Sequence, residues 1–321
     1  FAAVTESLGL DDLGAFGGSV FSADRGLQMR GFLGSPAPRT GLTGLLDGTT
    51  LPAAPPAWVP TGVGYGHLAL DLGKVWDLVV DVATRTGGPE AAQQMQMANG
   101  MTAMFIQTDL VSALRSLGTA HRFVNLPQSE DLGDGQDMQP FALVWDLADP
   151  AVVQRIIAFG KQQLTAQPGI TAVDEQGFTG LRFDQEGGGI SAAALLGPSN
   201  LVLGAGGDLT ARVVTSLNNP PAPADAMVGS DVFASGQDVL PYREGFWFQF
   251  SDGGRDLVSA ARQIMTRVLD GDVDPDVARR IEELMPGDED LQAAVGASVG
   301  QMRLEDGGVV MEAAVSTPDA E

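Results

Sequence analysis

Three acidic positions recur where an apolar strand pattern gives way to an amphipathic helix pattern. They are Asp71, Asp146 and the pair Ser251 and Asp252. If the three strands lie side by side, these side chains can converge into a cation site or an acid–base site. The simpler interpretation is that each one caps the following helix, because a side-chain oxygen satisfies free amides at a helix start. The recurrence therefore predicts helix capping, with the convergent site as the alternative.

The acidic segment "DGDVDPDVARRIEE", at residues 270–283, has the alternating spacing of a calcium-binding loop. An EF-hand loop requires glycine at its sixth position and a bidentate glutamate at its twelfth. Pro275 and Ile281 occupy those positions here, and Glu282 stands one residue too late. We therefore expect a solvated turn in which Asp274 caps the next helix, and calcium binding stays the alternative.

Residues that commonly carry catalysis or hold cofactors are sparse. The turn "GAGGDL" at 204–209 follows a strand, but Leu209 stands where a dinucleotide fingerprint requires glycine, and no P-loop lysine follows. His67 and His121 lie in strand patterns without a serine elbow or an H-E-x-x-H motif, although a Ser-His-Asp site assembled in space stays an alternative. No cysteine is present, which excludes thiolate catalysis and cysteine metal sites. The sequence predicts no catalytic, metal-binding or cofactor-binding residues, and a protein that is not an enzyme.

A methionine cluster is the main apolar feature outside the strand patterns. Met97, Met101 and Met104 share one helical face, with Met95 and Phe105 nearby. Such a face adapts to varied apolar partners, but Asn99 and Gly100 are expected to break the helix, so core filling is the favoured interpretation. The tryptophans at strand-to-helix units are also expected in the core: Trp58, Trp76, Trp145 and Trp247.

The composition describes a folded but strongly acidic protein. The 321 residues carry a formal net charge of -23, while 44% are hydrophobic and the mean hydropathy is +0.07. Disorder requires low hydrophobicity as well as high charge, so the acidic residues must lie on a packed protein. This charge disfavours nucleic acid and anionic membranes as partners, but not cations or basic surfaces. No apolar run approaches 18 residues, so the chain contains no membrane-spanning segment.

Two kinds of unit alternate along the chain. A short strand followed by an amphipathic helix is predicted at 65–83, 141–160 and 246–265, and hairpins at 14–36, 169–183 and 296–318. A further strand pair is predicted at 190–196 and 201–205, and further helices at 89–98, 108–117, 208–217 and 275–284. The expected fold class is α+β: repeated strand–helix and hairpin modules that form mainly antiparallel sheets covered by helices.

The hairpins at 14–36 and 296–318 share length and residue pattern. Aspartate and glycine recur at the turns, Asp24 with Gly26 and Asp306 with Gly308. We predict two copies of one module element, each preceded by a helix, at 3–9 and 288–295. Met29 and Met311 follow the two turns at the same interval, so both should point to the same sheet face, expected to be the core face. Chance similarity between two glycine-rich hairpins is the alternative.

The linkers suggest about two domains. Residues 1–126 are predicted as a first α+β domain, 127–140 as an exposed acidic linker without regular structure, and 141–321 as a second α+β domain. The opening stretch 1–36 reads as a module without its first strand and helix, and the chain starts at Phe1 rather than methionine. We therefore expect the chain to be part of a longer protein.

Three segments carry a family resemblance: "DLVSALRSLG" leading into "TAHRFVNLP", the unit "PAWVPTGVGYGHLALDLGKVWDLV", and "NLVLGAGGDLTARVV". Together they resemble a loosely defined family of long bacterial proteins with export signals, built from repeated α+β modules, which has no established activity or catalytic residues. The resemblance implies an extracytoplasmic location and a non-enzymatic role. We expect a structural or protein-interaction module whose partners are other protein subunits, and the alternative is a module that binds a divalent cation or an apolar small molecule.

Overall fold

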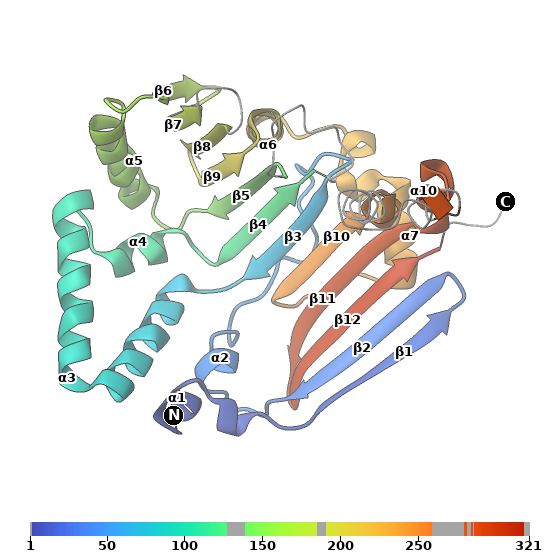
Figure 1. Cartoon of the computed structure of the whole chain (residues 1–321), viewed down its shortest axis with the longest axis horizontal. Coiled ribbons are helices and arrows are strands. Elements are labelled where there is room, and N and C mark those ends of the chain that lie inside the picture. Colours follow the sequence, from blue (N-terminus) through green and yellow to red (C-terminus); the bar gives the residue numbers. More distant parts are fainter. Residues whose placement is uncertain are drawn as a thin grey trace.

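The computed structural model describes residues 2–126, 139–184, 191–258, 279–280, 284 and 286–317. Its centre is one twelve-stranded antiparallel sheet, with the order β1-β2-β12-β11-β10-β3-β4-β5-β9-β8-β7-β6 (Figure 1). The strands are β1 (Phe16–Ala23), β2 (Gly26–Gly34), β3 (Gly64–Ala69), β4 (Ala120–Asn125), β5 (Phe141–Asp146), β6 (Ile170–Glu175), β7 (Phe178–Asp184), β8 (Ser191–Leu196), β9 (Asn200–Ala205), β10 (Trp247–Asp252), β11 (Ala297–Glu305) and β12 (Gly308–Ser316).

Several helices form where the sequence predicts them, including α4 (Leu110–Ser116), α5 (Pro150–Leu164) and α6 (Gly207–Asn218). Helix α3 (Leu72–Ile106) extends beyond its expected end at residue 98, and α7 (Asp231–Val239) was not predicted. Asp149 caps α5 by accepting from Ala151 N, with Pro150 at the first position, and Asp109 caps α4 by accepting from Ser112 N. The α-helices are α1 (Ala2–Ser7), α2 (Gly41–Gly44), α3 (Leu72–Ile106), α4 (Leu110–Ser116), α5 (Pro150–Leu164), α6 (Gly207–Asn218), α7 (Asp231–Val239) and α10 (Asp288–Ala294), and short 3-10 helices occupy Leu10–Asp12, Pro223–Asp225 and Met227–Gly229.

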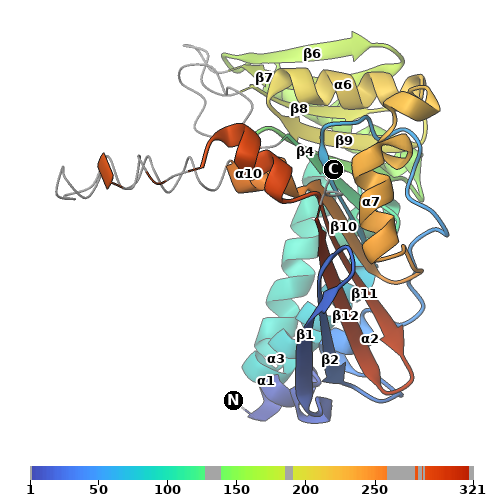
Figure 2. The same ribbon diagram turned by 90° about the vertical axis from the view of Figure 1, so that its right-hand side faces the viewer.

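The two faces of the sheet differ in what covers them. We call face A the side on which α6 and α7 lie, and face B the opposite side, where α3 and α10 lie (Figure 2). On face A, Phe233 of α7 packs edge-on against Phe250, with ring centroids 5.1 Å apart. On face B, α5 buries Val153 and Ile157 against Leu196 and Leu201, in a cluster separate from the main core. Figure 1 looks onto face B.

The predicted mixture of antiparallel strands and helices is confirmed. The hairpins at 14–36, 169–183 and 296–318 form as β1–β2, β6–β7 and β11–β12, and β8 pairs with β9. Both end hairpins turn at the predicted residues, since Ala23 pairs with Gly26 and Glu305 with Gly308. Helices α1 and α10 precede them, as expected.

The methionine prediction is wrong. Helix α3 runs through Asn99 and Gly100, and its non-helical backbone lies earlier, at Gly88 beside Pro89. The side chains of Met101 and Met104 are 58% and 83% exposed, so they do not fill the core. The Asn99 amide oxygen instead accepts the Leu110 N–H at 2.7 Å, which ties the end of α3 to the start of α4.

The sheet joins strands from both sides of the predicted boundary at 127–140. Strand β3 lies between β4 and β10, and β4 pairs with β5 across the acidic segment. Residues 127–138 of that segment, the helix expected at 275–284 and most of the helix after β10 lie outside the described residues.

Candidate functional site

The three acidic positions at the strand ends do not converge. Asp71 caps α3 by accepting from Gly73 N and Lys74 N, and Asp252 accepts from Arg255 N at 3.2 Å, so both confirm the capping interpretation. Capping is wrong for Asp146, which binds the Arg122 side chain instead, while Asp149 caps the helix. Because β10 runs antiparallel to its neighbour β3, Asp252 and Asp71 lie at opposite ends of these two paired strands.

Asp146 belongs to a polar cluster on face A. Its two carboxylate oxygens each accept from Arg122 at 2.6 Å, and Oδ1 also accepts from Asn200 at 2.7 Å. Tyr65 and His67 are buried beside them. Burial lowers the pKa of His67 to about 3, and the Arg122 charge acts in the same direction. A neutral, buried imidazole with this pKa is a poor general base, so the cluster's evident role is to hold β4, β5 and β9 together.

The other candidate motifs also resolve into structural roles. Gly206 has a φ of 83° and precedes α6, so the "GAGGDL" segment is a turn from strand to helix. Both histidines lie in strands, and in the described part of the chain neither one bonds to a serine or carboxylate side chain; His121 Nε2 lies 2.7 Å from the Leu70 carbonyl. No cluster of His, Asp or Glu among the described residues could hold a metal ion. The acidic segment 270–283 falls almost entirely outside them.

An apolar groove that the sequence did not predict lies on face B. It crosses β1, β2, β12, β11 and β10, where Figure 1 shows no described helix in front of the sheet. Its volume is about 390 Å³. Glycine and alanine leave its floor open, and larger apolar side chains form its walls: the floor residues are Gly18, Gly31 and Ala313, and the wall residues are Phe16, Val20, Met29, Met302, Met311 and Trp247.

The groove continues onto an exposed edge. Phe16, Val20 and Met29 are 70%, 61% and 52% exposed. The alternation of side chains along β1 and β2 directs all three to face B. Met29 and Met311 do share this face, as predicted, because Met29 pairs with Ala313, two residues from Met311. The expectation of a core position is wrong for Met29, because no described helix covers this end of face B.

The other face of the same hairpin also exposes two aromatic rings. Phe21 and Phe32 point to face A and are 45% and 40% exposed. Between Phe16 and Gly34 the charged residues are Asp24, Arg25 and Arg30, in a protein whose net charge is -23. A contiguous exposed apolar surface marks an interaction site more often than a scatter of single apolar residues does. The signal in the sequence was this uncharged, apolar run at 16–23.

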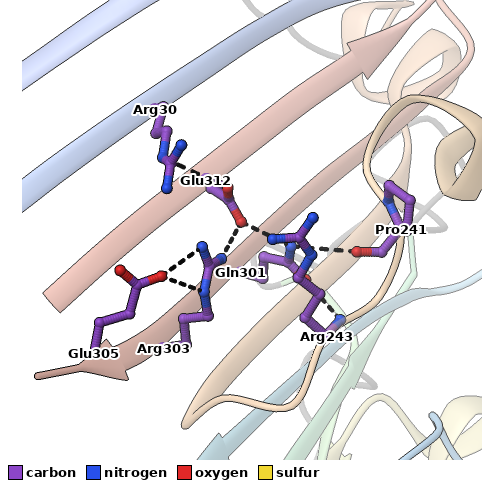
Figure 3. A network of polar contacts seen from close by, with 7 residues as sticks. All are labelled: Arg30, Pro241, Arg243, Gln301, Arg303, Glu305 and Glu312. Atoms are coloured by element: carbon purple, nitrogen blue, oxygen red, sulfur yellow. Dashed lines mark hydrogen bonds and ion pairs between the residues drawn. The ribbon is translucent and has the colours of Figure 1, made fainter.

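A polar network on face A fixes the strands that form the groove floor (Figure 3). Glu312 of β12 accepts from Arg303 and Gln301 of β11, and its Oε1 lies 3.8 Å from Arg30 Nε of β2. Gln301 also accepts from Arg243 N at 3.1 Å, which attaches the loop before β10. Burial disfavours the charged form of Glu312, but the Arg303 hydrogen bond and charge prevail and lower its pKa.

A second apolar groove, of about 500 Å³, lies on face B at the other end of the sheet. It lies over β5, β7, β8 and β9, beside the end of α5, and its larger residues are Phe141, Leu143, Leu164, Ile170, Leu181 and Phe183. The two grooves thus occupy opposite ends of one sheet face.

Comparisons with known proteins do not assign this chain to a family. A scan against protein-family models, a search of curated proteins and a search of solved structures each found no match to this chain. Within the described residues, no helix combines the length and apolar character needed to cross a membrane.

Proposed function

We propose that the protein is a non-catalytic, extracytoplasmic protein-interaction module that works within a larger assembly. One observation carries the proposal: the β1–β2 hairpin exposes apolar side chains on both faces and borders the groove on face B. Aromatic residues and methionine are enriched at the centres of protein interfaces. We further propose that the hairpins β1–β2 and β11–β12 are copies of one module, supported by their identical turn positions.

The proposal is tested by site-specific photo-crosslinking in cells that produce the protein. A benzoylphenylalanine at Phe16 should give a discrete protein adduct. The same residue at Val79, an exposed site on α3, serves as the control. The adduct protein, once purified, must bind the purified chain and lose affinity on Met29→Glu, which places a charge in the groove. Equal adducts from both positions, or no loss of affinity, would contradict the proposal.

Binding of an apolar small molecule is the second candidate, favoured by the groove's glycine floor and its volume. Ligand pockets commonly have volumes of roughly 300–1,000 Å³ and mostly apolar walls. Native mass spectrometry of the purified protein distinguishes the two functions, because a retained ligand adds a fixed mass that detergent removes. The divalent-cation alternative requires that calcium raise the melting temperature and that a chelator lower it.

A further inference from the structure

Strand β1 is an edge strand with an unusual free side. It ends the sheet order, so no described strand pairs with its outer side, and Figure 1 shows no described helix or strand beside that side. Hydrogen-bonding groups alternate in direction along a strand. The Ala15 carbonyl accepts from Gly34 N of β2 at 3.0 Å, so Phe16, Gly18 and Val20 present their backbone groups outward. This eight-residue strand contains no charge and no proline, the residues that usually protect an exposed edge.

The corresponding edge in the other hairpin is paired. Gly26 and Gly308 directly follow the two turns, and both have a φ of 157°. A Cβ at either position would clash with backbone atoms of the neighbouring strand. Counted back from these turns, β1 corresponds to β11. The outer side of β11 pairs with β10: Trp247 lies opposite Met302, Gln249 opposite Gly300, and Ser251 opposite Ser298. The corresponding residues of β1 are Val20, Gly18 and Phe16.

The most specific part of this pairing is an aromatic ring over a glycine. A Cβ at Gly300 would lie 2.9 Å from two ring carbons of Trp247, so the indole packs directly on Gly300. Gly18 stands at the corresponding place on β1, also on face B. The atoms that a Cβ there would approach are the Arg30 carbonyl oxygen at 3.3 Å and Gly31 Cα at 3.9 Å, both backbone. No described side chain lies over Gly18, so the space for a ring is open.

We propose that β1 accepts a donor strand, defined as an extended segment of a partner protein that carries an aromatic side chain. The strand adds antiparallel to β1 and places an aromatic ring over Gly18, as Trp247 does over Gly300. Main-chain hydrogen bonds supply affinity in strand addition, and pockets for alternate side chains supply specificity. This inference rests on the proposed function and names the mode by which the partner binds.

A second copy of the chain is the competing occupant. Its β1 could pair antiparallel with this β1, and Phe16 of that copy would then reach Gly18. Two copies each carry a net charge of -23, so their approach is opposed electrostatically. The donor strand is favoured because β10 already shows, within this protein, a strand of suitable chemistry on the corresponding edge.

The probe is a fluorescent peptide with the sequence of residues 243–252, "REGFWFQFSD". Fluorescence anisotropy should show saturable binding of one peptide per protein molecule. Two N-methylated versions of this peptide are compared with it. Methylation of Gln249 and Ser251 removes the N–H groups that would face β1, whereas methylation of Phe248 and Phe250 removes those that face away. The first should weaken binding about tenfold and the second by less than about threefold, from the loss of roughly two hydrogen bonds.

Variants of the protein test the same site. Gly18→Leu fills the space for the ring, and Val20→Pro removes an outward N–H that β2 does not use; both should weaken peptide binding at least tenfold. The melting temperatures of both variants should stay close to that of the unsubstituted protein. If Val20→Pro fails to fold, Gly18→Leu and the methylated peptides still test the inference.

Three results would overturn the inference. They are absence of peptide binding, equal binding of the two methylated peptides, and a stable dimer in solution that Val20→Pro dissociates. The second result leaves an apolar protein-binding surface intact, and the third assigns the edge to a second copy. Failure of strand addition is therefore distinguishable from failure of the proposed function, which the crosslinking experiment tests.

Discussion

Arg30 and Glu312 lie directly opposite each other on β2 and β12, and each occupies the same place in its own hairpin. The pairing is symmetric about them: Gly34 lies opposite Gly308 at one end, and Gly26 opposite Ser316 at the other. A local two-fold axis therefore passes through the sheet between these two side chains. Two identical hairpins would bring two like charges together here. This chain places an arginine opposite a glutamate, with Nε and Oε1 3.8 Å apart.

Glu312→Gln should destabilise the protein. The carboxylate side chain is 12% exposed, and the substitution leaves Arg303 without its buried charged partner. We expect the free energy of unfolding to fall by about 2 kcal/mol, measured by urea denaturation. Arg25→Gln is the control, because its ion pair with Asp238 lies on the surface and should contribute less than about 1 kcal/mol. Equal effects of the two substitutions would contradict the importance of the network.

The same carboxylate should contribute to acid sensitivity. The pKa of Glu312 is lowered in the folded protein from its usual value of 4.5. A lowered carboxylate pKa gives stability that is present above the unfolded value and is lost as the pH falls through the folded value. Between pH 6 and 3, Glu312→Gln should therefore show a shallower loss of stability than the unsubstituted protein. Parallel curves for the two proteins would refute this assignment.

His67 should stay neutral in the folded protein well below pH 6. Its pKa is lowered from 6.5 to about 3, so in that window the unfolded chain binds a proton that the folded protein does not. The free energy of unfolding must then fall as the pH falls below 6.5, by about 1.4 kcal/mol at pH 5.5. His67→Phe should remove that contribution. The chain has two histidines, which makes NMR titration of the imidazole protons practical. A midpoint above pH 5 for His67 would contradict the prediction.

Asp146→Asn should lower the free energy of unfolding by more than is expected for a half-exposed carboxylate. It removes the charge that pairs with both Arg122 nitrogens at 2.6 Å, and the Arg122 side chain is 10% exposed. We expect a loss of about 2–3 kcal/mol in thermal or urea unfolding, because a buried guanidinium loses its counter-charge. Asp174→Asn is the control, since that carboxylate pairs with Lys161 at an exposed site and its loss should have little effect on stability. A neutral Asp146→Asn would show that Arg122 finds another partner.

Local features of this fold were predictable because short-range chemistry determines them. Asp149 and Pro150 specify the start of α5, and aspartate with glycine specifies the turns at 24–26 and 306–308. The order of the strands was not predictable, because the pairing of β2 with β12 joins residues from opposite ends of the chain. That pairing also decides which residues are buried.

The candidate site was missed for the same reason. The sequence pattern directs Met29 to one face of a strand, but it does not say whether a helix covers that face. Asp146 likewise occupies a position typical of a helix cap, and the arrival of Arg122 from β4 changes its partner. The edge position of β1, which exposes Phe16 and Val20, follows from the order of the whole sheet.

The packing of Trp247 on Gly300 can be tested without any partner. Gly300→Ala would place a Cβ 2.9 Å from the indole ring, so the ring must move, and we expect a loss of about 1–3 kcal/mol in the free energy of unfolding. Gly17→Ala on β1 is the matched control: a Cβ there meets nothing within 4 Å, so stability should be unchanged or slightly higher, because alanine restricts the unfolded chain. Tryptophan fluorescence should shift with Gly300→Ala and not with Gly17→Ala. If Gly300→Ala is as stable as the control, the packing of the Trp247 indole does not require glycine at position 300. The open space over Gly18 would then no longer support a site for an aromatic ring of the donor strand.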